Sequence, residues 1–297
     1  MNKRTIALFA AFAATSIFGF NHTIAKELMP DVLSPNALLY CRVVGAAICF
    51  WFISLFLKNE KIEVKDFKLI IICAFFGMGL NMITALNGLY NSTPINSAII
   101  TTLAPIFIFL ISVIIIKEKI TRIKYVGVFI GFCGTLTLIL LNEKSVSSAP
   151  NINLGNFYLF INSISYALYF VLVKPLTKKY TMITIMKWLF LFSTFINMPF
   201  GLIEFTEINW VEISGVSLLK ISYVIFCTTF LVYLLNLYAL KNLKASTVGM
   251  FIYLQPVIGI LFAIYRGADK LTVADASSVL LVFIGVYLVS KKSTQIT

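Results

Sequence analysis

The sequence has few charged residues, and this scarcity excludes most soluble folds. Lysine, arginine, aspartate and glutamate make up 12% of the 297 residues, about half the share found in an ordinary soluble domain. Apolar residues make up 60% and recur in runs of about 20, long enough for helices that cross a bilayer. The sequence therefore predicts an all-α integral membrane protein with ten transmembrane helices. The ten runs are residues 5–25, 36–57, 67–89, 94–116, 123–141, 154–173, 184–203, 217–240, 245–265 and 273–290.

Histidine is almost absent, and so are the motifs of common membrane enzymes. The single histidine excludes an H-E-x-x-H metal site, and there is no G-x-S-x-G motif, intramembrane aspartate pair or phosphate-binding glycine loop. The five cysteines lie in the apolar runs without a C-x-x-C pair, which indicates packing residues. We therefore expect no metal site and no cofactor. A membrane enzyme is the least favoured alternative.

The segment MNKRTIALFAAFAATS, residues 1–16, also has the pattern of a signal peptide. It has a basic start, an apolar centre and small residues after that centre. We favour a retained helix, because removing this segment would leave nine helices and destroy the repeat described below.

The net charge of +12 is explained by membrane orientation and not by a nucleic-acid partner. If the amino terminus is cytoplasmic and the side alternates at each run, 18 of the 24 lysines and arginines are cytoplasmic and 5 are external. This asymmetry is the positive-inside pattern of membrane proteins. We therefore expect a multi-pass protein in the lipid bilayer, with both termini in the cytoplasm.

Two segments that lie half the chain apart have nearly the same sequence. LAPIFIFLISVIIIKEKIT (103–121) and LQPVIGILFAIYRGADKLT (254–272) are offset by 151 residues throughout. The polar segment NEKSVSSAPNIN separates two halves, so we expect a five-helix repeat at 1–141, a linker at 142–153 and a second repeat at 154–297. Because five is odd, the second half enters the membrane from the opposite side. Inverted repeats are typical of secondary transporters, whose substrate site lies between the halves.

The repeated segments resemble the EamA family of the drug/metabolite transporter superfamily. The resemblance rests on the ten runs, on the pattern P-(apolar run)-[ED]-K-[IL]-T in both halves, and on the pairs Phe18-Gly19 and Tyr166-Ala167. The family often has tryptophan at the aromatic position, which differs here. The resemblance implies a cavity surrounded by runs 1, 3, 4, 6, 8 and 9, export of amino acids and other metabolites, and a bacterial inner membrane. The glycines that fit the family are Gly127, Gly131, Gly134 and Gly285.

Amides, hydroxyls and tyrosines are the main polar side chains inside the runs, and they concentrate in the six runs expected around the cavity. Each one alone is explained by a hydrogen bond between helices, worth about 0.6 kcal/mol. As a set, they predict a cavity lining. The predicted lining is Asn21, His22, Asn81, Asn87, Thr101, Asn162, Tyr166, Tyr169, Tyr233, Asn236 and Tyr253, with Thr84 and Gln255 beside them.

Matched prolines and glycines predict bends and close contacts. Pro105 and Pro256 lie within apolar runs of the two halves, where they predict kinks that shape or gate the cavity. A static packing kink is the alternative. Gly127-x-x-x-Gly131 is a close-packing signature, which we expect to pack the fifth run against Gly285 in the tenth. A dimer face is the alternative, so a monomer or a weak homodimer fits the sequence.

Titratable side chains inside or beside the runs have two possible roles each. His22 titrates near neutral pH and can couple transport to protons, although a neutral donor at the interface is the commoner role. Arg42 is expected to reach the outer surface by snorkelling, with an anion-attracting charge at the cavity mouth as the alternative. Glu118 and Asp269 end matching helices, and we expect them to be structural.

The sequence thus predicts a secondary transporter that exports a small organic solute by alternating access. A cavity of amides and tyrosines without fixed charge suits neutral or zwitterionic solutes, so amino acids lead, followed by nucleosides, methylated metabolites and drugs. Coupling to protons or to a counter-solute is left open. A channel or facilitator pore is the main alternative, although no charge ring or carbonyl filter is apparent in the sequence.

Overall fold

The protein is helical throughout the part of the chain that the structure describes. This structure is a computed structural model, and it describes residues 2–29, 31–58, 60–92, 100–118, 121–141, 150–255, 257–258 and 273–290. The first half contains α1 (Lys3–Leu28), α2 (Pro35–Ser54), α3 (Val64–Ala74), η1 (Phe75–Leu80), α4 (Asn81–Asn91), α6 (Ala104–Ile115) and α7 (Arg122–Leu141). The second half contains α8 (Ile152–Leu172), η2 (Leu176–Lys178), α9 (Met182–Thr206), α10 (Gly215–Tyr223), η3 (Val224–Leu231), α11 (Val232–Asn242), α12 (Ala245–Met250), η4 (Phe251–Tyr253) and α14 (Val273–Ser290).

The helices have the length and the surface of membrane-spanning segments. Large apolar side chains are exposed on the outer faces, for example Phe9, Phe129 and Phe195, and a bilayer is the solvent that accommodates such a surface. Described helices occur in every predicted run, so the prediction of an all-α multi-pass membrane protein is confirmed. Six stretches are long and apolar enough to cross a membrane: Lys3–Asn21, Pro35–Ser54, Val64–Asn91, Ile152–Lys178, Met182–Thr206 and Gly215–Asn242, with Ala104–Ile115 and Val279–Val289 as shorter apolar helices.

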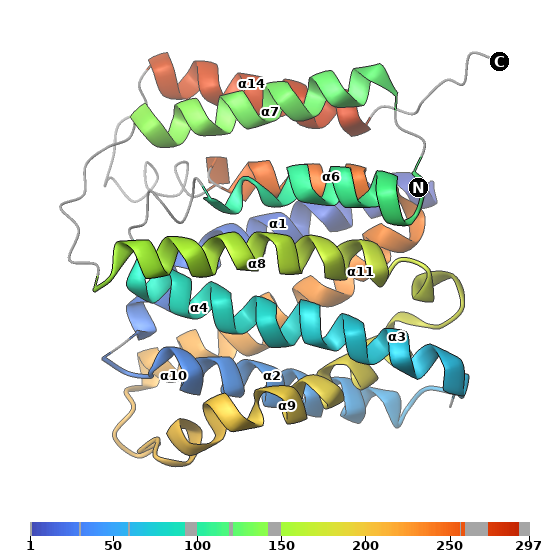
Figure 1. The fold of residues 1–297 in the computed structure, drawn as a ribbon. Helices are drawn as coiled ribbons and strands as arrows, with labels where there is room; N and C mark the ends of the chain where they lie inside the picture. Colours follow the sequence, from blue (N-terminus) through green and yellow to red (C-terminus); the bar gives the residue numbers. More distant parts are fainter. Residues whose placement is uncertain are drawn as a thin grey trace.

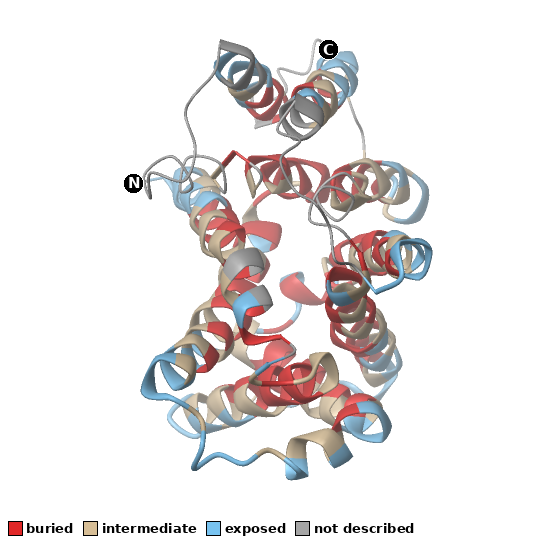
Figure 2. Cartoon of the chain, turned by 90° about the vertical axis from the view of Figure 1, so that its left-hand side faces the viewer, coloured by how far each residue is buried: buried red, intermediate tan, exposed pale blue. Residues whose placement is uncertain are grey.

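The two halves pack against each other along the length of the bundle. Helix α1 packs against α11, α2 against α9, α4 against α8, and α7 against α14 (Figure 1), so each pair joins one helix from each half. Viewed along the helix axes in Figure 2, buried residues face the interior of the bundle and exposed residues face outward. A site in the interior is therefore enclosed by both halves.

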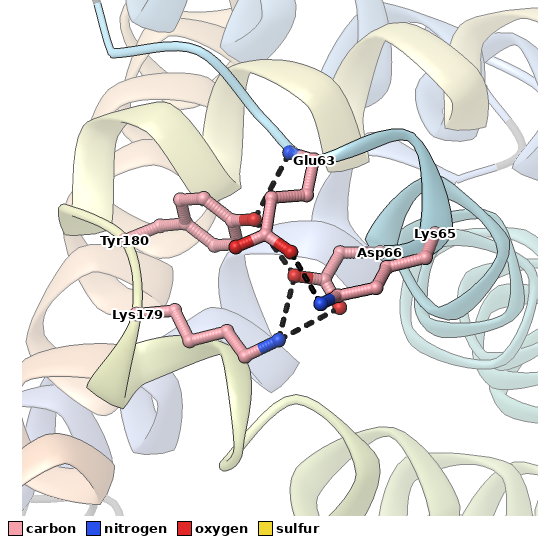
Figure 3. A network of polar contacts seen from close by, with 5 residues as sticks. All are labelled: Glu63, Lys65, Asp66, Lys179 and Tyr180. Carbon is pink, nitrogen blue, oxygen red and sulfur yellow. Dashed lines mark hydrogen bonds and ion pairs between the residues drawn. The ribbon is translucent and has the colours of Figure 1, made fainter.

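One end of the bundle, here called the basic end, is the end where α1 begins and α14 ends. It lies on the right in Figure 1. A polar network outside the apolar core ties α3 to the segment before α9 at this end (Figure 3). The Asp66 carboxylate accepts hydrogen bonds from Lys179 Nζ at 3.0 and 2.8 Å and from the Tyr180 hydroxyl at 2.7 Å. The Tyr180 oxygen accepts from the Glu63 backbone N–H at 3.1 Å, and Glu63 pairs with Lys65 at 2.6 Å. Hydrogen bonding to Asp66 raises the pKa of Lys179.

The two halves contain the same irregularity in helix geometry. In the third and eighth runs a π-helical segment, η1 or η3, leads directly into an α-helix. The helices that follow, α4 and α11, are offset by 151 residues at both ends, which is the offset of the repeated sequence. A π-helical turn holds an extra residue, and it commonly occurs at functional sites. The repeat therefore extends from the sequence to the backbone.

Glycines allow α7 and α14 to approach closely. A methyl group at Gly127 would lie 3.0 Å from the Gly285 carbonyl oxygen, and one at Gly285 would lie 2.7 Å from the Gly127 carbonyl oxygen. A methyl group at Gly131 would lie 2.9 Å from the ring of Tyr253, and Gly134 is buried in the same helix. The structure thus places these glycines at contacts within the molecule.

Candidate substrate cavity

A cavity of about 110 Å³ lies between the two halves. A water molecule requires about 10–15 Å³ of such space, so the cavity has room for several waters or for a small organic solute. Its wall comes from α1, α2, α4, α6, α8, α11, α12 and η4, and it is mostly apolar. The polar and charged side chains in the wall are Thr15, Asn21, Arg42, Asn81, Thr101, Asn162, Tyr166, Tyr233, Asn236 and Gln255.

Most of the predicted polar residues come together at this cavity. The six runs that the family resemblance implied all contribute to the wall, and α2 contributes as well through Arg42. The predicted residues that line the cavity are Asn21, Asn81, Thr101, Asn162, Tyr166, Tyr233 and Asn236, together with Gln255.

Asn87 lies away from the cavity, contrary to the prediction. Its Nδ2 donates to Asn36 Oδ1 at 3.1 Å and to the Ile83 carbonyl oxygen at 2.9 Å. An α-helix turns by about 100° per residue, so a residue six positions after Asn81 lies about 120° away around the helix. Asn87 therefore faces α2.

Tyr169 and Tyr253 are packed into the protein and do not line the cavity, which corrects the prediction for both. Tyr169 is 2% exposed, and a methyl group at Gly77 would lie 2.5 Å from its ring. Tyr253 is fully buried beside Gly131. A tyrosine ring packed on a glycine fills space between helices, so it leaves little surface for a solute.

Pro105 does not lie inside a continuous helix, which is the position that the sequence suggested. It lies in the first turn of α6, where the backbone N–H has no helical partner and proline is well tolerated. The run is interrupted just before it, at residues 102–103, so the fourth run is a broken helix beside the cavity. In the second half, the 3₁₀ turn η4 falls at the equivalent position. Pro256 and the side chain of His22 lie outside the described residues.

Asn81 and Asn162 form a reciprocal contact across the two halves. Asn162 Nδ2 donates to the Asn81 backbone carbonyl at 2.8 Å, and Asn81 Nδ2 donates to the Asn162 carbonyl at 3.3 Å. Because backbone carbonyls only accept, these contacts fix the orientation of both amides. Within the described residues, neither amide oxygen accepts a hydrogen bond, so both remain available as acceptors.

The π-helical segment η1 positions Asn81 and is held by side chains of the second half. The carbonyl oxygens of residues 76–78 accept, in order, from Ser165 Oγ at 2.7 Å, from the Tyr233 hydroxyl at 3.3 Å and from Asn197 Nδ2 at 3.3 Å. These donors come from α8, α11 and α9. A backbone carbonyl oxygen has two lone pairs, and here three helices of the other half supply side-chain donors to it at these residues.

Arg42 lines the cavity and does not snorkel to the surface, which corrects the expectation. The residue is 3% exposed, and its Nε donates to Thr229 Oγ1 at 3.0 Å. Thr229 Oγ1 in turn donates to the Val224 carbonyl at 2.8 Å within η3. The contact between α2 and η3 holds the side chain inside the bundle, so the cavity carries a fixed positive charge.

Positions related by the internal repeat line the cavity together, and their chemistry differs. In each such pair, one side chain is polar and the other is apolar. The space is therefore formed symmetrically while its hydrogen-bonding groups are placed asymmetrically. At the offset of 151 residues the pairs are Asn81 with Val232, Met82 with Tyr233, Ala85 with Asn236, Thr101 with Ile252, and Ala104 with Gln255, and the aligned aromatic positions of the first run in each half add Phe18 with Tyr166.

Comparisons with known proteins agree with this arrangement. The EamA-like transporter family matches residues 5–140 and again residues 153–291. The chain belongs to this family. Among its relatives, an uncharacterized transporter of Archaeoglobus fulgidus is 28% identical over 264 residues, covering 88% of this chain and 90% of that protein. The uncharacterized transporter YyaM of Bacillus subtilis is 26% identical over 287 residues, covering 93% and 90%.

The fold of this EamA protein is also found among solved structures. A protein crystal structure superposes with a TM-score of 0.75 at 14% identity and covers 95% of each chain. At this identity the likeness shows the fold alone. The family match and the relatives together indicate that the chain is a multi-pass membrane transporter of small molecules. They point to a transporter rather than an enzyme.

Two supporting residues of this EamA transporter, Ser165 and Asn197, were missed by sequence reasoning, and Arg42 was given the wrong leading role. Arg42 carried a usable signal, because an ionisable residue well inside a transmembrane run is a functional candidate by default. Ser165 and Asn197 were ordinary polar residues in apolar runs. Their role depends on the carbonyls of the π-helical segment that they contact. No pattern in the sequence predicted a π-helical segment there.

Proposed function

We propose that this EamA transporter is a secondary carrier that moves small organic metabolites, with amino acids or related zwitterionic solutes as the leading class, from cytoplasm to exterior by alternating access. The observation that supports it most is the cavity between two repeated halves, with polar side chains on an otherwise apolar wall. Small-molecule sites usually have this composition. Inverted repeats allow two near-equivalent conformations, each open to one side.

Contacts at the basic end support the alternating-access part of the proposal. Glu118 Oε1 accepts a hydrogen bond from Ser246 Oγ, and Lys124 Nζ donates to Thr247 Oγ1 at 3.0 Å. Glu118 and Lys124 belong to the first half, whereas Ser246 and Thr247 begin α12 of the second half. Glu118 was expected to be structural, and its contact with Ser246 joins the two halves. These contacts tie the two halves together at the basic end, and a carrier that opens there would have to break them.

Counterflow in proteoliposomes tests the proposal. Vesicles are loaded with a mixed pool of amino acids and other metabolites, and exchange is followed by mass spectrometry against protein-free vesicles. Saturable exchange of one compound class is expected. An ion leak without exchange would instead indicate a channel, and exchange by protein-free vesicles at the same rate would remove the support.

Two cavity substitutions test where the solute binds. Asn81→Leu and Asn236→Leu each remove a hydrogen-bonding side chain from the cavity wall, so we expect KM for exchange to rise about tenfold, the size of one lost hydrogen bond to a polar solute. Asn87→Leu on α4 and Asn242→Leu on α11 are matched controls, because both asparagines lie away from the cavity. All variants are compared as monodisperse protein. Unchanged kinetics in both cavity variants would show that the solute binds elsewhere.

A further inference from the structure

Arg42 is the one charged side chain among the described residues that line the cavity. The three ion pairs formed by described residues, Lys65–Glu63, Lys179–Asp66 and Lys220–Glu27, do not include it. A positive charge inside a membrane bundle is unfavourable unless an anion accompanies it. Since no carboxylate of the described chain pairs with Arg42, the anion can come from the solute.

The hydrogen bonding of Arg42 leaves a defined edge of its guanidinium unused. Nε donates to Thr229 Oγ1 at 3.0 Å. The two terminal amino groups, Nη1 and Nη2, make no hydrogen bond with any described residue. Two parallel N–H groups at the end of a guanidinium match the two oxygens of a carboxylate. Thr229 therefore holds the Arg42 side chain in place, while Nη1 and Nη2 of the guanidinium make no hydrogen bond with a described residue.

A second and independent observation concerns Asn21 on the same cavity wall. The residue is 5% exposed, and its Oδ1 is buried without a hydrogen-bond partner. A buried acceptor without a donor is unfavourable. The Asn81 and Asn162 amide oxygens are also unused, so the cavity offers several acceptors for N–H groups of a solute.

We infer that Arg42 forms a carboxylate subsite, and that the transported solute carries one carboxylate together with an N–H donor that bonds to Asn21 Oδ1. This inference deepens the proposed function and rests on it for the direction of transport, but not for binding. A single carboxylate fits better than a phosphate, because the described wall provides one positive charge and otherwise neutral groups.

The test compares solutes that differ only at the carboxylate. Each amino acid of the loading pool is paired with its amide, which keeps the side chain and the α-amino group and removes the negative charge. Counterflow is measured for both, and the thermal stability of the purified full-length protein in detergent is measured with each compound. The second readout detects binding without requiring transport.

The expected result is a tenfold or larger preference for the acid over its amide in the wild-type protein. Arg42→Gln abolishes this preference, and Arg42→Lys retains part of it because the charge remains while the paired N–H groups are lost. Arg122→Gln removes an exposed arginine at the start of α7 and is the matched control, with the preference intact. If Arg42→Gln does not fold, Thr229→Val provides the test, because loss of the Nε contact is expected to weaken the preference several-fold.

The outcomes separate this inference from the proposed function. Equal exchange of acids and amides by the wild-type protein, or an acid preference that survives Arg42→Gln, would overturn the subsite and leave the carrier. Stabilisation by acids alone that disappears in Arg42→Gln, without any exchange, would support the subsite and contradict the carrier. If neither acids nor amides stabilise the protein or exchange, both are wrong.

Discussion

At the scale of single residues, the cavity combines a repeated shape with unrepeated chemistry. Asn236 faces the cavity at the position where the first half has Ala85, and Asn81 does so where the second half has Val232. Arg42 has no charged equivalent: counted from the N-caps Ser34 and Thr181, the matching residue of α9 is the buried Leu189. A solute held by these groups is therefore bound in one orientation.

If the solute binds in one orientation, exchanging equivalent residues between the two halves should weaken its binding. The double variant Ala85→Asn/Asn236→Ala keeps the number of amides in the cavity and moves one of them to the other half. Because the moved amide no longer meets the same group of the solute, we expect KM for counterflow to rise about tenfold, equivalent to one hydrogen bond of about 1.4 kcal/mol. Asn236→Ala alone should show the same loss. Recovery of the wild-type KM in the double variant would mean that the two positions are interchangeable.

At the scale of elements, the π-helical segment η1 determines how the third run meets the second half. Its glycines permit a close approach, because a methyl group at Gly79 would lie 2.9 Å from Ile196 of α9. Three of its carbonyls are satisfied by side chains of other helices. The segment is therefore tied by hydrogen bonds to three helices of the second half.

Gly77→Ala tests how closely η1 is packed. The added methyl group would lie 2.5 Å from the Tyr169 ring, and overpacking of a buried site typically costs about 1–3 kcal/mol. We expect a lower free energy of unfolding and a lower Tm in detergent. Gly215→Ala is the matched control at the start of α10, where nothing lies within 4 Å of the added methyl group, and it should leave Tm unchanged or slightly raised. Equal Tm values for the two variants would show that η1 tolerates additional volume.

At the scale of the whole molecule, hydropathy, charge and repetition predicted much of the architecture. Long apolar runs indicate which segments lie in the membrane. The ten runs and the all-α membrane fold could therefore be predicted from the sequence. Apolar runs do not report how each helix is rotated about its axis. Arg42 and Asn87 were misplaced for that reason. The interruption before Pro105 and the π-helical segments were also missed, because they depend on contacts with other helices.

The cavity itself was predictable as a set of residues but not in detail. Most predicted amides and tyrosines line it because a polar side chain in an apolar run must face other protein groups or a cavity. Tyr169 and Tyr253 instead face other protein groups, with their rings packed on glycines, and the buried Tyr253 hydroxyl has no hydrogen-bond partner among the described residues. The sequence pattern does not show whether a given polar side chain faces the cavity or packs against other protein groups.

In the proposed mechanism, one cavity between the halves opens alternately to either side of the membrane. The most direct test is labelling of Ala85→Cys by a membrane-impermeant thiol reagent, in a variant whose five native cysteines are replaced. Ala85 lines the cavity and is small, so cysteine fits with little disturbance. We predict labelling from the cytoplasmic face in inside-out vesicles and from the external face in right-side-out vesicles, with saturating solute slowing both. Labelling from one face only, with no effect of solute, would contradict alternating access.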